Sequence, residues 1–373
     1  MRAVLDALVR QLELDEPCAL ATIVRTSRSA PAAPGTAMLV RADGSAVGSL
    51  SGGCIEGAVH DVAATVLTTG APVIERYGLA DDEFEVGLPC GGEMEILVEQ
   101  LTPADRPDLI RLRDDVKCRR MVAVATVLEH PSLQHRGRHL TVSTDDHTGS
   151  TGSAHLDAVF VEQVRELMRV GRSEVMQLTD GGESTISAFV EVMAPTPRMI
   201  IYGATEIGSA VARQGRLLGN YVTLCDARTL FATRDRFPDV DELIVEWPHR
   251  HLSAEVTAGR VDENTVLCIL THDPKFDIPL LDVALRLPHL GYIGAMGSRR
   301  IHQDRVKQLR EAGLGRDELA RLHSPIGLDL GAHTPAETAV SIVAEIVASR
   351  HGGEGRSLRS GAGPIHHRRN DAE

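Results

Sequence analysis

A chain of 373 residues is long enough to form two or three domains, each with its own hydrophobic core. Its 43% hydrophobic and 24% charged residues are typical of a globular protein, whereas only 3% aromatic residues leave little material for stacking nucleic-acid bases. The formal net charge of −13 also argues against nucleic acid as the main partner. The chain has no run of 18 apolar residues and opens with an acidic amphipathic helical pattern, so we expect a cytoplasmic protein with no membrane partner.

The first predicted strands cover residues 18–25 and 36–40, and a turn at Asp43-Gly44 follows them. Next comes Gly48-Ser-Leu-Ser-Gly-Gly-Cys-Ile-Glu-Gly57, in which glycines and serines surround one cysteine. A helical pattern over residues 55–67 then places Cys54 at or just before a helix N-terminus. There, free backbone N–H groups and the helix dipole favour an anion and help a thiol to lose its proton. The alternative is a glycine-rich turn in which the cysteine has no role.

The six cysteines show no C-x-x-C pair and no zinc-like spacing, so we expect neither a disulfide framework nor a zinc site. Four of them lie in or before apolar strand-like runs, where a thiol is most often a small buried hydrophobe; these are Cys18, Cys118, Cys225 and Cys268. Only Cys54 and Cys90 are set among glycines.

The first half of the chain contains an internal repeat. Ala21-Thr-Ile-Val24 is echoed by Ala125-Thr-Val-Leu128, Gly48-Ser49 by Gly149-Ser150, Gly70 by Gly171 and Glu56 by Asp157. The second copy has neither cysteine loop, which suggests that the fold does not require these loops and that Cys54 and Cys90 serve function. We therefore predict two related α/β units, over residues 1–105 and 115–194, within one domain of residues 1–194.

The second half reads as a Rossmann-like, doubly wound parallel sheet over residues 195–350. A predicted strand over residues 198–202 leads into Gly203-Ala-Thr-Glu-Ile-Gly208, a helix, a strand over residues 221–225 and Asp226. The middle glycine of the dinucleotide fingerprint is replaced by Thr205, and Glu206 adds a negative charge beside it. Ordinary NAD(P) binding is therefore the less favoured interpretation, and a Rossmann sheet that binds nothing at this turn is the alternative.

Three further strand ends lead into polar loops, which in doubly wound sheets are candidate ligand sites. They are Thr271-His-Asp273, Gly294-Ala-Met-Gly-Ser-Arg-Arg300 and Ser324-Pro-Ile-Gly-Leu-Asp-Leu-Gly331. The second suits an anion best, because glycines expose N–H groups at a helix start and two arginines add positive charge. Arg299 and Arg300 are alternatively solvated first-turn residues. A final helix is predicted with Thr334 as N-cap, Pro335 at N1 and Glu337 completing a capping box, and residues 351–373 are predicted to be a disordered tail.

Six motifs in this order and spacing resemble those of one family, the XdhC/CoxI accessory proteins of xanthine dehydrogenase and related molybdenum hydroxylases. The resemblance spans roughly residues 5–350. The motifs are Ser51-Gly-Gly-Cys-Ile-Glu56, Leu88-Pro-Cys-Gly-Gly92, Thr271-His-Asp273, Ile293-Gly-Ala-Met-Gly-Ser-Arg-Arg300, Pro325-Ile-Gly-Leu-Asp-Leu-Gly331 and Thr334-Pro-Ala-Glu337.

The resemblance implies a protein that binds molybdenum cofactor, as molybdopterin or its dinucleotide form, without catalysing the redox reaction itself. It would protect the cofactor while a terminal oxo ligand is exchanged for sulfido and deliver it to a molybdenum hydroxylase apo-enzyme. A cysteine desulfurase-type sulfur donor is the second implied partner, and a homodimer through either half is compatible with the sequence.

Carried over residue by residue, Cys54 and Cys90 match the glycine-flanked cysteines of the family and become candidate molybdenum contacts or sulfur relays. The Rossmann loops would bind the pterin phosphate or its nucleotide extension, although Thr205 stands where the family commonly has glycine. The cofactor-binding positions that follow are Gly52, Gly53, Cys54, Glu56, Cys90, Gly91 and Gly92 in the first half, and Gly203, Gly208, Asp226, His272, Gly294, Gly297, Ser298, Arg299 and Asp329 in the second.

Two other functions compete with that of a cofactor chaperone. The Rossmann half and Asp226 are compatible with an NAD(P)-dependent oxidoreductase, which predicts stabilisation by a dinucleotide. A scaffold that acts through protein contacts alone is the third possibility, and it predicts that neither cofactor nor cysteine matters.

Overall fold

The computed structural model describes residues 1–27, 30–78, 92–179 and 185–360. The chain divides into two compact units, Met1–Pro195 and Thr196–Glu373. Each unit has its own hydrophobic clusters, so each folds around side chains of its own.

The first unit contains two five-stranded antiparallel sheets with the same strand order. The order is β3-β2-β1-β5-β4 in the first sheet and β8-β7-β6-β10-β9 in the second. The first sheet consists of β1 (Cys18–Ser27), β2 (Ala37–Arg41), β3 (Ala46–Gly48), β4 (Val73–Tyr77) and β5 (Glu93–Leu101). The second consists of β6 (Val122–Glu129), β7 (His139–Ser143), β8 (His147–Gly149), β9 (Glu174–Thr179) and β10 (Thr185–Met193).

Corresponding landmarks of the predicted repeat occupy the same places in both copies. Gly48 and Gly149 end β3 and β8, and Gly70 and Gly171 cap the helices that follow, in the left-handed conformation with φ of 71° and 65°. The predicted duplication is therefore confirmed.

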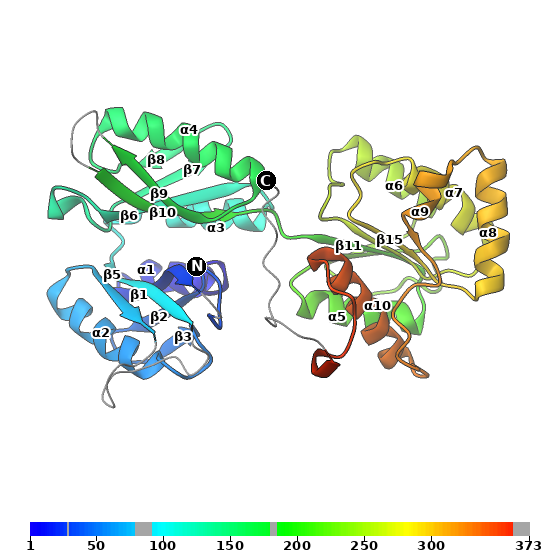
Figure 1. Cartoon of the computed structure of the whole chain (residues 1–373), viewed down its shortest axis with the longest axis horizontal. Coiled ribbons are helices and arrows are strands. Elements are labelled where there is room, and N and C mark those ends of the chain that lie inside the picture. Colours follow the sequence, from blue (N-terminus) through cyan, green and yellow to red (C-terminus); the bar gives the residue numbers. More distant parts are fainter. Residues whose placement is uncertain (28–29, 79–91, 180–184, 361–373) are drawn as a thin grey trace. The chain divides into compact units, whose positions relative to one another are not determined.

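The first unit is layered as helix, sheet, sheet, helix (Figure 1). Helix α2 (Glu56–Thr69) packs on one face of the first sheet, and α4 (Ala154–Val170) packs on one face of the second. The other faces of the two sheets meet through Val24 and Leu97 on one side and Leu128 and Phe189 on the other. Helices α1 (Leu5–Glu13) and α3 (Leu109–Lys117) share a further cluster with both sheets. Short η1 (Arg2–Val4) comes directly before α1. Short η2 (Leu133–His135) lies between β6 and β7.

The second unit is a six-stranded parallel sheet in the order β13-β12-β11-β14-β15-β16. Its strands are β11 (Arg198–Tyr202), β12 (Tyr221–Cys225), β13 (Glu242–Ile244), β14 (Val266–Ile269), β15 (Tyr292–Ala295) and β16 (Leu322–His323). Its helices are α5 (Glu206–Leu217), α6 (Pro248–Thr257), α7 (Pro274–Leu285), α8 (Arg299–Glu311), α9 (Arg316–Ala320) and α10 (Pro335–His351), with η3 (Leu358–Ser360) after them. From β11 the chain adds β12 and β13 on one side and then returns to add β14, β15 and β16 on the other. The boundary between β11 and β14 is the position where doubly wound sheets bind ligands.

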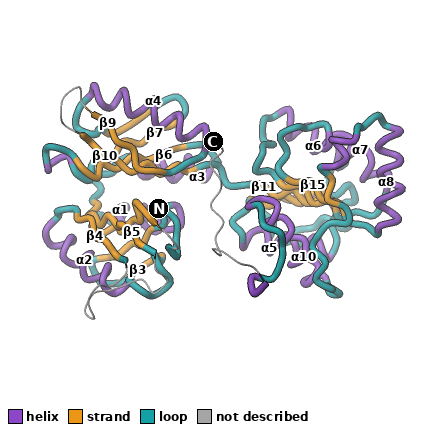
Figure 2. The backbone as a smooth tube through the Cα atoms, viewed as in Figure 1, coloured by secondary structure: helices purple, strands orange, loops and turns teal. Residues whose placement is uncertain are grey.

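Helices cover both faces of this sheet (Figure 2). Alternate residues of β11 separate the two sides: Met199 and Ile201 pack with α5 and α10, whereas Ile200 and Tyr202 pack with α6, α7 and α8. A strand that is buried on both faces reads as a continuous apolar run, which explains why the sequence predicts it. The predicted fold class, a duplicated α/β unit followed by a Rossmann-like sheet, is confirmed.

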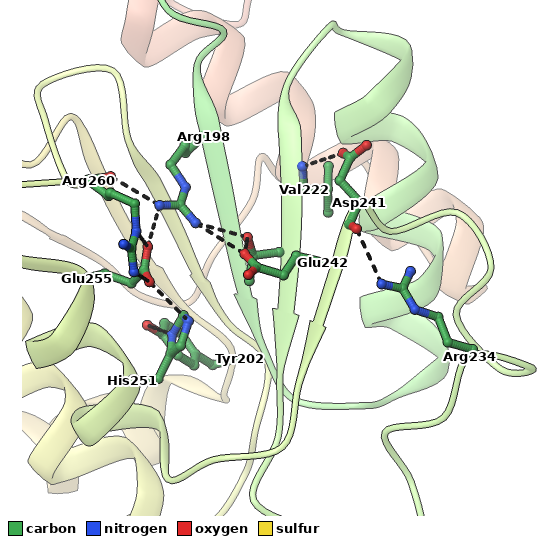
Figure 3. A network of polar contacts seen from close by, with 10 residues as sticks. Arg198, Tyr202, Val222, Arg234, Asp241, Glu242, His251, Glu255 and Arg260 are labelled. Carbon is green, nitrogen blue, oxygen red and sulfur yellow. Dashed lines mark hydrogen bonds and ion pairs between the residues drawn. The ribbon is translucent and has the colours of Figure 1, made fainter. Parts of the chain in front are cut away.

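A buried polar network ties the sheet to α6 (Figure 3). Arg198 is 2% exposed and donates to the Glu255 carboxylate and to Thr223 Oγ1, the latter at 3.2 Å. Tyr202 Oη lies 3.2 Å from His251 Nδ1 on the same helix. Burial alone would raise the pKa of Glu255, but Arg260 and Arg198 outweigh it and hold that pKa at about 2.

The cysteines fall into two groups by exposure. Cys18, Cys225 and Cys268 are buried, as predicted, and burial raises the pKa of each of these thiols to about 12. The same prediction is wrong for Cys118, which is exposed because α3 ends at Lys117 and the chain turns into solvent. No helix among the described residues is long and apolar enough to span a membrane.

Candidate functional site

The Cys54 loop, residues 49–55, connects β3 to α2. Cys54 is exposed and lies two residues before the first residue of α2, as the sequence predicts. Gly52 and Gly53 have φ of 81° and 121°, and a Cβ on either would meet no atom of the described residues within 4 Å. These glycines are therefore required by the backbone conformation and not by crowding from those residues.

The loop wraps around the carboxylate of Glu56, the first residue of α2. The carboxylate accepts from backbone N–H groups on both sides of Cys54 and from the hydroxyls of two serines that precede it. The donors to Oε1 are Ser49 Oγ (2.6 Å), Leu50 N (3.1 Å), Ser51 N (2.8 Å) and Gly52 N (3.0 Å), and the donors to Oε2 are Ser51 Oγ (2.7 Å), Gly53 N (2.8 Å) and Ile55 N (3.3 Å). Cys54 N donates instead to Ser51 Oγ at 3.0 Å. The sequence predicts that these N–H groups are free to bind an anion, but the Glu56 carboxylate already binds most of them.

The electrostatics of Glu56 follow from these bonds. Burial alone would raise the pKa of its carboxyl group, but hydrogen bonds from Ser49 and Ser51 outweigh that effect and hold the pKa well below its usual range. Glu56 is therefore a carboxylate at any physiological pH.

The second copy of the repeat has a simpler version of the same arrangement. Asp157 occupies the equivalent place and accepts from Ser150 Oγ (2.6 Å), Thr151 N (2.7 Å) and Thr151 Oγ1 (2.6 Å). No cysteine stands in this loop. Cys90 and Gly91, the other half of the predicted cysteine pair, lie outside the described residues, and Gly92 is buried immediately before β5.

In the second unit, the predicted site residues lie on loops at one edge of the sheet, because parallel strands end on the same side. The Gly203–Thr205 turn follows β11. The others follow β12, β14, β15 and β16; they are Asp226, His272, Gly297, Ser298 and Asp329. His272, Ser298 and Asp329 are exposed there.

The glycines of the first Rossmann turn are explained by close packing. A Cβ on Gly203, whose φ is 123°, would lie 3.0 Å from backbone atoms of Leu270 and Thr271, and one on Gly208 would lie 2.6 Å from Gly203 O. Thr205, the residue that breaks the fingerprint, is the N-cap of α5, and its hydroxyl accepts from Gly208 N at 3.0 Å.

Asp226 is engaged within the protein and is 2% exposed. Its carboxylate accepts from Ala204 N (2.7 Å) and from Arg228 Nε (2.9 Å) and Nη2 (2.7 Å). Burial would raise the pKa of Asp226, but the bonds from Arg228 outweigh it and lower that pKa. In a dinucleotide-binding fold this carboxylate would hold ribose hydroxyls, whereas here Arg228 and Ala204 occupy it.

The loop before α8 combines packing with exposed positive charge. Gly294 lies inside β15, where a Cβ would approach Ile326 Cδ1 to 2.4 Å, so this glycine serves packing. Ser298 caps α8 by accepting from Ile301 N at 3.2 Å. Arg299 and Arg300 are exposed in the first turn, where they are available to an anion.

A buried ion pair that the sequence did not reveal holds the strand-end loops of the second unit together through hydrogen bonds. Arg305 and Asp277 side chains are each 3% exposed, and Arg305 Nη2 lies 2.8 Å from Asp277 Oδ2. Arg305 also donates to Ser324 Oγ (3.1 Å) and to Met296 O (3.0 Å), and Asp277 accepts from the Thr271 hydroxyl. One arginine thus connects the loops after β14, β15 and β16. The signal in the sequence was a charged residue one helical turn before Leu309, which is buried in the same helix.

Helix α10 holds the loop that carries Asp329. Ser341 Oγ donates to Leu328 O at 2.5 Å, and the Glu345 carboxylate accepts from Gly327 N (2.7 Å) and Tyr292 Oη (2.5 Å). Among the described residues, no group of three or more His, Cys, Asp or Glu side chains is arranged to hold a metal ion.

Two family models match the chain, one in each unit. The model for the XdhC and CoxI family matches residues 11–78, which include the Cys54 loop, and the model for the XdhC Rossmann domain matches residues 199–346.

Relatives and a solved structure are similar over nearly the whole chain. A Bacillus subtilis protein named as a probable subunit of xanthine dehydrogenase is 28% identical over 349 residues, which cover 93% of this chain and 96% of that protein. The molybdenum cofactor insertion chaperone PaoD of Escherichia coli is 25% identical over 94% of this chain and 88% of that protein. The crystal structure of a xanthine dehydrogenase from Bacillus halodurans has a TM-score of 0.73 and 26% identity, and covers 96% of this chain and 98% of that chain.

Proposed function

Because this chain belongs to the XdhC and CoxI family, we propose that it binds molybdenum cofactor as cargo, supports its sulfuration and delivers it to an apo-enzyme of the xanthine dehydrogenase type. The names of two relatives, a probable subunit of xanthine dehydrogenase and a molybdenum cofactor insertion chaperone, support a role in maturation. The observation that carries the proposal is the exposed thiol of Cys54, held in a glycine-rich loop inside the matched segment.

The chemistry of this loop suits the cargo. A thiolate is a soft ligand that fits a molybdenum centre, and an accessible thiol can also carry sulfur as a persulfide. No described residue crowds Gly52 or Gly53, so a bulky cofactor can approach the backbone beside Cys54 from this side. Cys90 is the second candidate thiol, and a cysteine desulfurase-type partner is the proposed source of sulfur.

The exposed loops of the second unit are the proposed site for the phosphate or nucleotide part of the cargo. Arg299 and Arg300 follow the N-cap Ser298, so a phosphate there would meet both fixed positive charge and the positive end of α8. His272 and Asp329 are exposed on the loops after β14 and β16, the two strands that flank β15.

The test is to purify the protein from cells that make the cofactor and to measure bound molybdenum by mass spectrometry and bound pterin by fluorescence. Wild type is expected to retain both and to activate an apo-hydroxylase, and Cys54→Ser and Cys90→Ser are expected to reduce retention and activation. Cys118→Ser is the matched control, because Cys118 is exposed like Cys54 but lies in an unrelated loop. Wild-type protein that carries neither molybdenum nor pterin would refute the proposal.

Binding of NAD(P) by the Rossmann unit is the second candidate, because the parallel sheet and the Gly203 turn are those of a dinucleotide fold. The pairing of Asp226 with Arg228 speaks against it. A ligand at 100 times its dissociation constant adds about 2.7 kcal/mol of stability, so thermal unfolding with NAD(H) and NADP(H) decides between the two. An unchanged melting temperature with all four removes this candidate.

A further inference from the structure

The Cys54 loop owes its shape to one side chain. Within the part of the chain that the structure describes, the loop has little packing at its tip, since a Cβ on Gly52 or Gly53 would meet nothing within 4 Å there. Its backbone is held instead by hydrogen bonds, and most of these end on the two carboxylate oxygens of Glu56. Without that carboxylate, several N–H groups of a short exposed loop would lose their acceptor at the same time.

The second copy shows which part of this arrangement belongs to the fold and which part belongs to the cysteine. Asp157 binds only the start of its loop, through Ser150 and Thr151. Glu56 has one more methylene and also reaches Gly53 N and Ile55 N, the amides on either side of Cys54. The longer side chain is therefore matched to the loop that carries the cysteine.

Glu56 has no spare capacity for a ligand in this arrangement. Each oxygen accepts at least three hydrogen bonds from the loop, and a carboxylate has about four acceptor positions in total. The Cys54 side chain, in contrast, is exposed. The loop thus separates a residue that fixes the backbone from a residue that is free to react.

We infer that Glu56 is a positioning residue: its carboxylate folds residues 49–55 around itself and so presents the Cys54 thiol, without touching the cargo. The inference rests on the proposed role of Cys54 and names the residue on which that role depends. It also means that an oxygen anion of the cargo does not bind the loop amides unless Glu56 leaves them.

The test compares Glu56→Ala, Glu56→Gln and Glu56→Asp with wild type by amide hydrogen exchange and by alkylation of Cys54 with iodoacetamide, followed by peptide mass spectrometry. Glu56→Ala is expected to speed exchange of the amides of Ser51, Gly52, Gly53 and Ile55 about 10-fold or more, since each loses a charge-assisted bond. Glu56→Asp is expected to keep protection at Leu50 and to lose it at Gly53, because Asp157 accepts from Thr151 N, the equivalent of Leu50 N in the repeat.

Cys54 alkylation is the readout that a purely structural role would leave unchanged. In Glu56→Gln, which replaces one acceptor oxygen with an NH2 group at nearly constant shape, the rate at pH 7 is expected to change at least about 3-fold, because the amides on either side of Cys54 lose acceptors and no longer hold the thiol in place. Asp157→Asn is the matched control and is expected to leave both readouts at Cys54 unchanged.

Wild-type exchange and alkylation at Cys54 in Glu56→Ala and Glu56→Gln would overturn the inference. Neither readout depends on cofactor, so the outcome is distinct from that of the proposed function. A loosened loop in a protein that binds no molybdenum cofactor refutes the cargo and leaves the positioning role standing. Cofactor retained at the wild-type level by Glu56→Ala, with an ordered loop, refutes the positioning role alone.

Discussion

Replacing Arg305 with Met should destabilise the second unit more than any exposed substitution on the same helices. The change removes the partner of Asp277, and both side chains of this pair are 3% exposed. Removal of one member of a buried ion pair leaves an uncompensated charge and typically costs about 3–5 kcal/mol. With an m-value of about 2 kcal/mol/M, the urea midpoint should fall by about 1.5–2.5 M.

The single tryptophan makes the assay specific for this unit. Trp247 packs against Phe276, at 5.2 Å between ring centroids, and Phe276 precedes Asp277 in α7. Tryptophan fluorescence during urea unfolding therefore reports on the structure around the pair. Arg286→Met is the control, because Arg286 pairs with Asp282 on the exposed side of α7 and surface pairs contribute little.

The pH dependence of the loss gives a second check. Burial already raises the pKa of Asp277, and removal of Arg305 raises it further. A carboxyl group whose folded pKa exceeds its unfolded value opposes folding at high pH and ceases to do so as the pH falls below both values. The loss should therefore be largest near pH 7 and smaller at pH 4.5.

Two results would refute this reasoning. One is a urea midpoint of Arg305→Met within about 0.5 M of the wild-type midpoint, well short of the expected shift of about 1.5–2.5 M. The other is a double variant, Asp277→Leu with Arg305→Met, that is no more stable than Arg305→Met alone, since removal of both charges should recover stability.

Three further predictions concern the fold that supports the site. Arg260 and Arg198 hold the pKa of Glu255 at about 2 in place of 4.5, so the stability that this group contributes is present above about pH 4.5 and is lost as the pH falls towards 2. In Glu255→Gln, the free energy of unfolding measured in urea should therefore depend less on pH between these two values. Thr205→Ala should lower unfolding free energy by about 1 kcal/mol through loss of the α5 cap, whereas an unchanged urea midpoint would show that the cap bond is weak. Gly208→Ala should destabilise by about 1–3 kcal/mol, because its Cβ meets Gly203 O. The matched Gly57→Ala, at a helical glycine that no described residue crowds, should be neutral or stabilising by circular dichroism in urea, and equal effects of the two changes would contradict the packing explanation.

Local patterns predicted the elements well. The buried strands of the second unit appeared as apolar runs, and the predicted cap of α10 is present, since Thr334 accepts from Glu337 N beside Pro335. The repeat was visible because the glycines at the helix C-caps and at the ends of β3 and β8 are set by local backbone conformation and do not depend on distant contacts. Period and cap chemistry act within a few residues, so the sequence contains their signal directly.

Partners of polar side chains were not predictable in the same way. Sequence analysis placed Asp226 and Glu56 among ligand-binding residues, but Asp226 is held by Arg228 and Ala204, and Glu56 is held by its own loop. The Asp277–Arg305 pair had no motif at all, because its two residues come from different helices. Burial and distance decide which charges meet, and both emerge only when helices and sheet are assembled.

The sequence by itself determined the family resemblance, the duplicated first half, the parallel sheet of the second half and the place of Cys54 just before a helix. Each of these depends on apolar periodicity or on residues a few positions apart. Only the tertiary structure shows that Glu56 accepts hydrogen bonds from the amides around Cys54, that Asp226 pairs with Arg228 and that Arg305 connects three strand-end loops. These outcomes depend on which groups are brought within hydrogen-bonding distance once burial has removed water as their partner.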